Sequence, residues 1–136
     1  MSSLVLDAWA VMAWLKDQPA AVRVQALLDD ADSRKGRLFM NIVNLGEVLY
    51  LSAKARDLAY GERVLASLRS RVTIMSASDD LVMSAARLKF RYAISYADAF
   101  AAATAIIREL PLLTGDPELR VVATQEKKLQ LEWIGG

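Results

Sequence analysis

The sequence predicts an α/β fold in which helices cover both faces of a mainly parallel central sheet. Short apolar runs of strand length alternate with longer segments that have helical patterning. The segments between successive runs are long enough for right-handed crossover connections. The chain has 136 residues, of which 54% are hydrophobic, which suits one domain with a substantial core. We therefore expect a three-layer α/β/α sandwich formed by a single domain, residues 1–136.

Five short apolar or β-branched runs have the length of buried strands. The run Leu4-Val5-Leu6 ends at Asp7, and Leu112-Leu113-Thr114 is followed by Gly115-Asp116-Pro117, a common turn composition. In chain order, the strands are predicted at Leu4–Leu6, Leu38–Met40, Val72–Met75, Leu112–Thr114 and Leu131–Ile134.

The intervening segments carry helix signals. Pro19 is a favoured first-turn residue, Asn41 or Asn44 can cap the helix after the second strand, and Ser78 or Asp79 can cap a later one. Pro111 ends the helix that Ser95 opens. The helices are predicted at about 8–16, 19–31, 41 or 44 to 55, 58–70, 78–90 and 95–110, with a short helical segment after Pro117.

Composition removes several kinds of chemistry. The chain has no cysteine and no histidine, which excludes disulfides, thiolate nucleophiles, thiolate metal sites and imidazole bases. Its formal net charge of +1 neither indicates nor excludes a nucleic-acid partner. The apolar runs are far shorter than a membrane span, and the N-terminus lacks the features of a secretory signal. We therefore expect a cytoplasmic protein without a membrane partner.

Four acids are predicted at the same edge of the sheet. Asp7 and Asp116 follow the first and fourth strands, Glu47 lies early in the helix after the second strand, and Asp98 lies in a first helical turn. In open α/β sheets, ligands bind outside the carboxyl ends of the strands, where helix N-termini converge. Topology would therefore bring together acids that are distant in sequence.

Each acid also has a purely structural explanation. Asp7 can cap the following helix, and Asp116 lies in a turn composition. Asp98 stands three residues after Ser95 and can complete a capping box. Glu47 lies on an apolar helical stripe, where a buried partner such as an arginine would explain it.

Taken together, the acids indicate a divalent cation site. Clustered carboxylates repel one another, and a bound cation offsets that repulsion. Carboxylate oxygens suit Mg²⁺ or Mn²⁺, which can activate water and stabilise charge on a phosphate. Phosphodiester hydrolysis is a reaction that such a set of carboxylates and a bound cation can catalyse.

At these residues the sequence resembles the PIN-domain ribonucleases, and among them the VapC-type toxins of prokaryotic toxin–antitoxin pairs. The resemblance spans nearly the whole chain and rests on the order and spacing of four motifs. These are V-L-D-A at Val5–Ala8, N-L-G-E-V at Asn44–Val48, Y-A-D-A at Tyr96–Ala99 and L-T-G-D-P-E at Leu113–Glu118.

The resemblance implies a PIN-like fold and a Mg²⁺- or Mn²⁺-dependent endoribonuclease toxin. Metal-activated water would attack an RNA phosphodiester and leave 5′-phosphate and 3′-hydroxyl ends. A cognate antitoxin would neutralise the toxin, which would form a homodimer. The catalytic and metal-binding set would be Asp7, Glu47, Asp98 and Asp116. Thr114 would support the site with its hydroxyl, and Glu118 is either a further acid of the site or a first-turn helix acid.

The chain departs from the family pattern at Trp9, where many relatives carry a small hydroxyl residue two positions after the first aspartate. Trp9 and Trp14 either pack in the core or line a groove for an antitoxin helix. Two basic clusters are either solvated or contact RNA phosphates. They are Arg34, Lys35 and Arg37, and Arg87, Lys89 and Arg91.

Other functions stay open at this point. A different metal-dependent phosphohydrolase or a DNA nuclease would use the same acids, and a catalytically silent PIN-like module would bind protein instead. A receiver-type phosphoacceptor domain fits less well, because Asp7 has no acidic neighbour.

Overall fold

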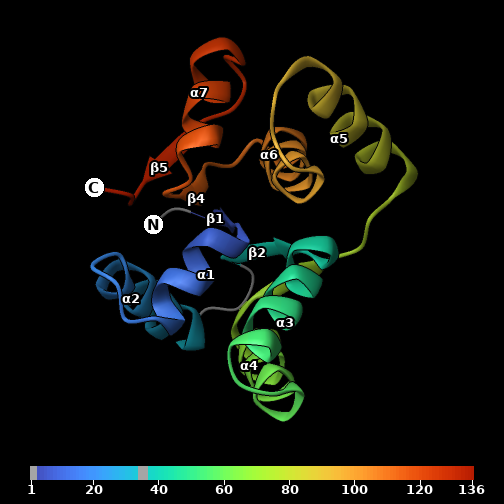
Figure 1. Cartoon of the computed structure of the whole chain (residues 1–136). Helices are drawn as coiled ribbons and strands as arrows, with labels where there is room; N and C mark the ends of the chain where they lie inside the picture. The colour runs from blue at the N-terminus through green and yellow to red at the C-terminus, as the bar shows by residue number, and fades with distance from the viewer. Residues whose placement is uncertain (1–2, 34–36) are drawn as a thin grey trace.

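The computed structural model describes residues 3–33 and 37–136, which form alternating strands and helices (Figure 1). The strands are β1 (Leu4–Leu6), β2 (Leu38–Asn41), β3 (Thr73–Met75), β4 (Leu112–Thr114) and β5 (Leu131–Trp133). The helices are α1 (Ala8–Leu15), α2 (Ala21–Ser33), α3 (Ile42–Ala55), α4 (Leu58–Arg71), α5 (Asp79–Arg91), α6 (Tyr96–Arg108) and α7 (Pro117–Gln125). Every predicted strand is present, and the predicted helices differ only at their ends.

All neighbouring strands of the sheet are parallel, in the order β3-β2-β1-β4-β5. The central β1 pairs on both sides, since Val5 lies opposite Phe39 of β2 and Leu112 of β4. The chain first runs outward through β2 and β3, and then returns to the other side of β1 for β4 and β5. The strand order therefore reverses between β1 and β4, where doubly wound folds have their binding crevice.

The helices form a layer on each face of the sheet, as the sequence predicts. On β1, Leu4 and Leu6 belong to a core with α1, α2, α3 and α4. Val5 points the other way, into a second core with α5, α6 and α7. Figure 1 shows the two groups of helices on opposite sides of the strands. The fold is thus a three-layer α/β/α sandwich.

The ends of three helices resolve or correct the sequence predictions. Asn41, not Asn44, caps α3, because its Oδ1 accepts a hydrogen bond from the Val43 N–H at 2.8 Å. Ser78 caps α5. Helix α2 begins at Ala21 rather than Pro19, since the chain first turns through residues 16–20.

Helix α6 lies deep in the molecule because most side chains in one stretch of it are small. Its alanines at 99, 101, 102, 103 and 105 are at most 1% exposed. Small side chains allow the helix backbone to approach the sheet closely. The N-terminus of α6, with Asp98, is thereby held at a fixed position beside the strands. None of the helices in the described part of the chain has the length and apolarity that crossing a membrane requires.

We expect Leu113→Ala to lower the free energy of unfolding by about 2–5 kcal/mol, because Leu113 is fully buried on β4 and its truncation leaves a cavity. Leu58→Ala is the matched control: Leu58 is 61% exposed, and its truncation should change stability by about 0.5 kcal/mol or less. Urea denaturation of both variants measures the difference. Equal losses would contradict the described core.

Candidate active site

Asp7 is a buried carboxylate that is held from two sides. It is 1% exposed and caps α1, with its Oδ1 accepting a hydrogen bond from the Ala10 N–H at 2.8 Å. Its Oδ2 accepts a hydrogen bond from the Thr114 hydroxyl at the end of β4. The first aspartate is therefore both a helix cap and a link between β1 and β4.

Thr114 also orients Asp116 through a hydrogen bond. The Thr114 Oγ1 accepts a hydrogen bond from the Asp116 N–H at 3.0 Å, while its proton goes to Asp7. Asp116 in turn caps α7, since its Oδ1 accepts a hydrogen bond from the Glu118 N–H at 2.9 Å. The supporting role implied for the Thr114 hydroxyl thus has a geometric basis.

Asp98 and Glu47 approach from two other helices. Asp98 lies in the first turn of α6, where its N–H donates a hydrogen bond to Oγ of the capping Ser95 at 3.1 Å. Glu47 is half-buried on α3, beside Asn44. The Asn44 amide also donates a hydrogen bond to the Ala97 carbonyl at 2.9 Å, which ties α3 to the start of α6. One buried asparagine, Asn44, therefore links the helix that carries Glu47 to the helix that carries Asp98.

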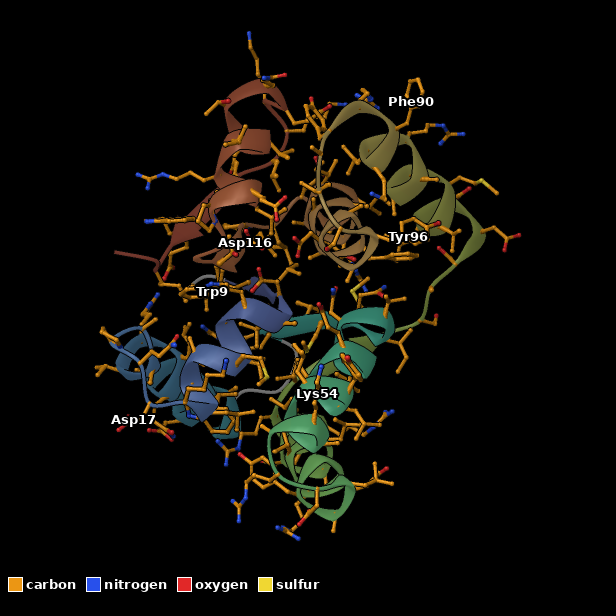
Figure 2. All side chains as sticks on the ribbon, in the orientation of Figure 1. Trp9, Asp17, Lys54, Phe90, Tyr96 and Asp116 are labelled. Carbon is orange, nitrogen blue, oxygen red and sulfur yellow. The ribbon has the colours of Figure 1, made fainter. Side chains whose placement is uncertain are left out.

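A pocket of about 330 Å³ lies where these elements meet. Glu47, Asp98, Asp116 and Glu118 all line it. Asp7 does not line it, although its neighbours Ala8 and Trp9 do. The remaining lining residues are Met12, Ala13, Lys16, Gln18, Leu51 and Ser95. Figure 2 labels Asp116 and Trp9, which lie close together near the start of α1.

Three carboxylates come closest to one another. One oxygen each of Asp98, Asp116 and Glu118 lies within 4.8 Å of the others. Of the sequence-predicted set, Asp98 and Asp116 are in this group, whereas Asp7 and Glu47 are coupled to it through their charges. Glu118, for which the sequence left two roles open, lies both in the first turn of α7 and in the cluster.

The site strongly disfavours negative charge. Burial raises the pKa of Asp7 from 3.8 to about 7, and the Asp116 and Glu47 charges add to the rise that the Thr114 and Ala10 hydrogen bonds oppose. Burial also raises the pKa of Asp98 from 3.8 to about 8, with further contributions from the charge and hydrogen bond of Asp116 and from the Asp7 and Glu47 charges. The pKa of Glu47 is raised mainly by burial.

Among the described residues, no ion pair offsets the repulsion between these acids. In the described part of the chain, no lysine or arginine forms an ion pair with any of the four predicted acids. Among the described residues, no arginine pairs with Glu47, and Asn44 lies beside its carboxylate instead. Several hard oxygen ligands that form no ion pair within the described part of the chain fit a divalent cation such as Mg²⁺ or Mn²⁺.

Sequence reasoning missed the buried asparagines. Asn41 is 0% and Asn44 1% exposed, and the Asn41 Nδ2 and the Asn44 Oδ1 lack a hydrogen-bond partner. The sequence suggests each as a helix cap, and places Asn44 also in the N-L-G-E-V motif. A signal was present, because Asn44 precedes Glu47 by three residues and so shares its helical face.

The described members of the two basic clusters do not line the acidic pocket. Of the first, residues 34–36 are outside the described residues, and Arg37 is 3.8 Å from Asp30. In the second, Lys89 Nζ donates a hydrogen bond to the Ile94 carbonyl at 2.8 Å, and Arg91 pairs with Glu126 at 2.6 Å. None of the described members lines the acidic pocket.

The two early tryptophans differ. Trp14 packs against the core of α1–α4, as predicted, and its indole N–H donates a hydrogen bond to the Gln25 side chain at 2.7 Å. Trp9 is partly buried but belongs to neither core cluster, so core packing is wrong for it.

A sequence model of the PIN domain matches residues 4–125, nearly the whole chain. The chain belongs to the PIN-domain family. Its acids lie at the switch point between β1 and β4, and the fold predicted from the resemblance is confirmed. A comparison with curated protein sequences gave no match.

Solved structures share the PIN-like fold of this chain at low sequence identity. VapBC from Salmonella typhimurium, bound to DNA, has a TM-score of 0.73 at 17% identity, covering 97% of this chain and 98% of that one. VapC20 from Mycobacterium tuberculosis, described as a sarcin–ricin loop cleaving toxin, has a TM-score of 0.70 at 17% identity, covering 98% of both chains. VapBC-5 from the same organism has a TM-score of 0.65 at 22% identity, covering 98% and 100%.

Without divalent cations, we expect the acidic pocket to destabilise the PIN domain as pH rises. Asp7 and Asp98 have raised pKa values in the folded state, so their contribution is fully present below about pH 4 and is lost as pH rises to about 8. Asp98→Asn should remove part of this loss and raise stability at pH 8 by on the order of 1 kcal/mol, since partial exposure screens the repulsion.

Urea denaturation in EDTA at about pH 5 and about pH 8 checks this expectation. Asp57→Asn is the control, because Asp57 caps α4 at an exposed position and lies outside the pocket. A stability difference between wild type and Asp98→Asn that does not change with pH would contradict the described electrostatics.

Thr114→Val should cost about 1–3 kcal/mol near neutral pH, because the buried Asp7 carboxylate loses a donor and the Asp116 N–H loses its acceptor. Thr104→Val is a matched control: Thr104 is equally buried, but its hydroxyl bonds only the Phe100 carbonyl of its own helix. Thermal and urea unfolding should show the larger loss for Thr114→Val. A larger loss for Thr104→Val would argue against the bridging role of Thr114.

Proposed function

We propose that this PIN-domain protein is a divalent-cation-dependent endoribonuclease that hydrolyses RNA phosphodiester bonds. Asp7, Glu47, Asp98 and Asp116 are the proposed catalytic and metal-binding residues, with Glu118 as an additional acid and Thr114 as their support. The observation that carries the proposal is a carboxylate cluster, with no ion-paired lysine or arginine among the described residues, in a pocket beside the switch point of a PIN domain.

The donors suit Mg²⁺ or Mn²⁺, which when bound would stabilise charge on a phosphate and lower the pKa of water. Asp98, Asp116 and Glu118 would hold the cation directly, because their oxygens already lie within 4.8 Å of one another. The hydrogen bonds from the Ala10 N–H and the Thr114 hydroxyl would keep the Asp7 carboxylate in place beside the cation.

Proton balance in the pocket follows from the raised pKa values. Because the pKa values of Asp7 and Asp98 are raised, part of the metal-free protein would carry a proton on each of them near neutral pH. Cation binding would release those protons, since the ligands must be ionised. Glu47, half-buried at the wall of the pocket, would then be placed to accept a proton on its carboxylate during hydrolysis.

The pocket also offers a contact for the RNA backbone. Among its described lining residues, Lys16 is the only cation. An ammonium beside the acids would attract the phosphate that the carboxylates alone would repel.

The biological setting is part of the same proposal. The structural relatives include VapBC toxin–antitoxin complexes and a toxin described as cleaving the sarcin–ricin loop. We therefore propose a cytoplasmic toxin of the VapC type that acts on RNA, is neutralised by a cognate antitoxin protein and forms a homodimer. An antitoxin-like protein that copurifies with the chain and suppresses cleavage would support this setting.

We expect wild type to cleave structured RNA in Mg²⁺ or Mn²⁺, and EDTA to abolish the cleavage. Asp98→Asn and Glu47→Gln should each lower the rate by about 100-fold or more, because each removes charge from the proposed cation site. The readout is the appearance of fragments with 5′-phosphate ends on denaturing gels.

Asp57→Asn is the control and should cleave at the wild-type rate, since this cap of α4 does not line the pocket. Cleavage that persists in EDTA, or that Asp98→Asn retains in full, would overturn the mechanism. Cleavage of single-stranded DNA in preference to RNA would replace the proposed substrate.

A further inference from the structure

Trp9 forms a wall between two hollows of the surface. On one side lies the acidic pocket, which Trp9 lines together with Glu47, Asp98 and Asp116. On the other side lies a second pocket of about 460 Å³, which we call the Trp9 pocket. It is lined by Trp9, Gln18, Pro19, Ala20, Ile134, Gly135 and Gly136. Gln18 also lines both pockets, so the two pockets lie next to each other on this face.

The position of the Trp9 ring is fixed by the turn that carries two site residues. A Cβ added to Gly115 would lie 2.2 Å from Cη2, 2.5 Å from Cζ3 and 2.6 Å from Cζ2 of Trp9. The indole therefore lies directly against the Gly115 backbone, between Thr114 and Asp116. Figure 2 shows Trp9 and Asp116 as close neighbours, at the starts of α1 and α7. The aromatic ring is thus placed beside the proposed cation site by its contact with Gly115.

The polar atom of Trp9 differs from those of the other two tryptophans. The indole N–H groups of Trp14 and Trp133 donate hydrogen bonds to Gln25 and to the Gly136 carbonyl. Within the described part of the chain, the Trp9 N–H has no acceptor, and it is not among the buried polar atoms without a partner. Since an indole N–H normally finds a partner when it is buried, that of Trp9 is available to a ligand.

The chemistry of the Trp9 pocket suits a nucleobase. Among the described residues, no charged side chain lines it, and its walls include an indole, a proline ring, an isoleucine and glycine backbone. Bases stack on aromatic faces, and the side-chain amide of Gln18 offers a donor and an acceptor for a base edge. The acidic pocket is proposed to take a phosphate, and the neighbouring Trp9 pocket suits a base. A phosphate and a base are adjacent groups in one polynucleotide strand.

We propose that the Trp9 pocket is a nucleobase subsite, in which an unpaired RNA base stacks on Trp9 while an adjacent phosphate lies in the acidic pocket. This subsite rests on the proposed ribonuclease function and adds to it a preference for single-stranded or flipped-out nucleotides. Trp9 is a specificity residue in this arrangement, and Gln18 contacts the edge of the base.

The test measures binding rather than cleavage, by fluorescence anisotropy of labelled single-stranded RNA with Ca²⁺ as the cation. The probes are oligo-A, oligo-C, oligo-G and oligo-U, and an oligomer of abasic ribose-phosphate of the same length. Wild type should bind at least one homopolymer more tightly than the abasic strand. Trp9→Ala should weaken that binding by about tenfold, the loss of one stacked base, and leave abasic binding unchanged.

Two further variants separate stacking from folding. Trp9→Phe retains a ring and should lose only about threefold. Trp14→Phe changes the other tryptophan of α1, which lines neither pocket, and should bind as wild type. Circular dichroism and the thermal midpoint of each variant establish that it is folded.

An equal loss on the abasic and base-containing strands, or wild-type affinity in Trp9→Ala, would overturn the subsite. RNA cleavage by a protein whose Trp9→Ala variant shows no base-dependent loss would support the proposed function and contradict the subsite. A base-dependent loss in a protein that cleaves no RNA would support the subsite and contradict the hydrolytic function.

Discussion

Asp7 and Thr114 join the two strands between which the order of the sheet reverses, and the geometry of the site depends on that hydrogen bond. Asp7 ends β1 and begins α1, whereas Thr114 ends β4 and orients the N-terminus of α7 through Asp116. A buried carboxylate is costly unless it is satisfied, and here two donors from different segments satisfy it. The hydrogen bonds that stabilise the buried Asp7 carboxylate therefore also fix the positions of the neighbouring acids.

Much of this arrangement follows from local sequence. The apolar runs around Val5 and Leu113 have strand length, and crossover connections make such strands parallel. A parallel sheet then places Asp7 and Asp116 at one edge without any knowledge of contacts. The capping and site explanations for the acids turned out not to compete. Asp7 and Asp116 each cap a helix with one oxygen and keep the rest of the carboxylate for the pocket or for Thr114.

Other features depend on side-chain geometry that a pattern does not encode. Asn44 ties α3 to α6 through the Ala97 carbonyl, 53 residues away, and its position on the Glu47 face of the helix does not predict that long-range contact. The closeness of Glu118 to Asp98 depends on how α7 leaves the Asp116 turn. The place of Trp9, outside both cores, depends on a contact with the Gly115 backbone between distant segments. Long-range contacts of this kind are not visible in residue spacing.

The contact between Trp9 and Gly115 has an evolutionary consequence. An indole at position 9 leaves no room for any side chain at position 115, so the two positions cannot change independently. An alanine at position 115 would require the indole ring of Trp9 to move or to be replaced by a smaller side chain. Among homologues, these positions should therefore covary even though they lie at opposite ends of the chain.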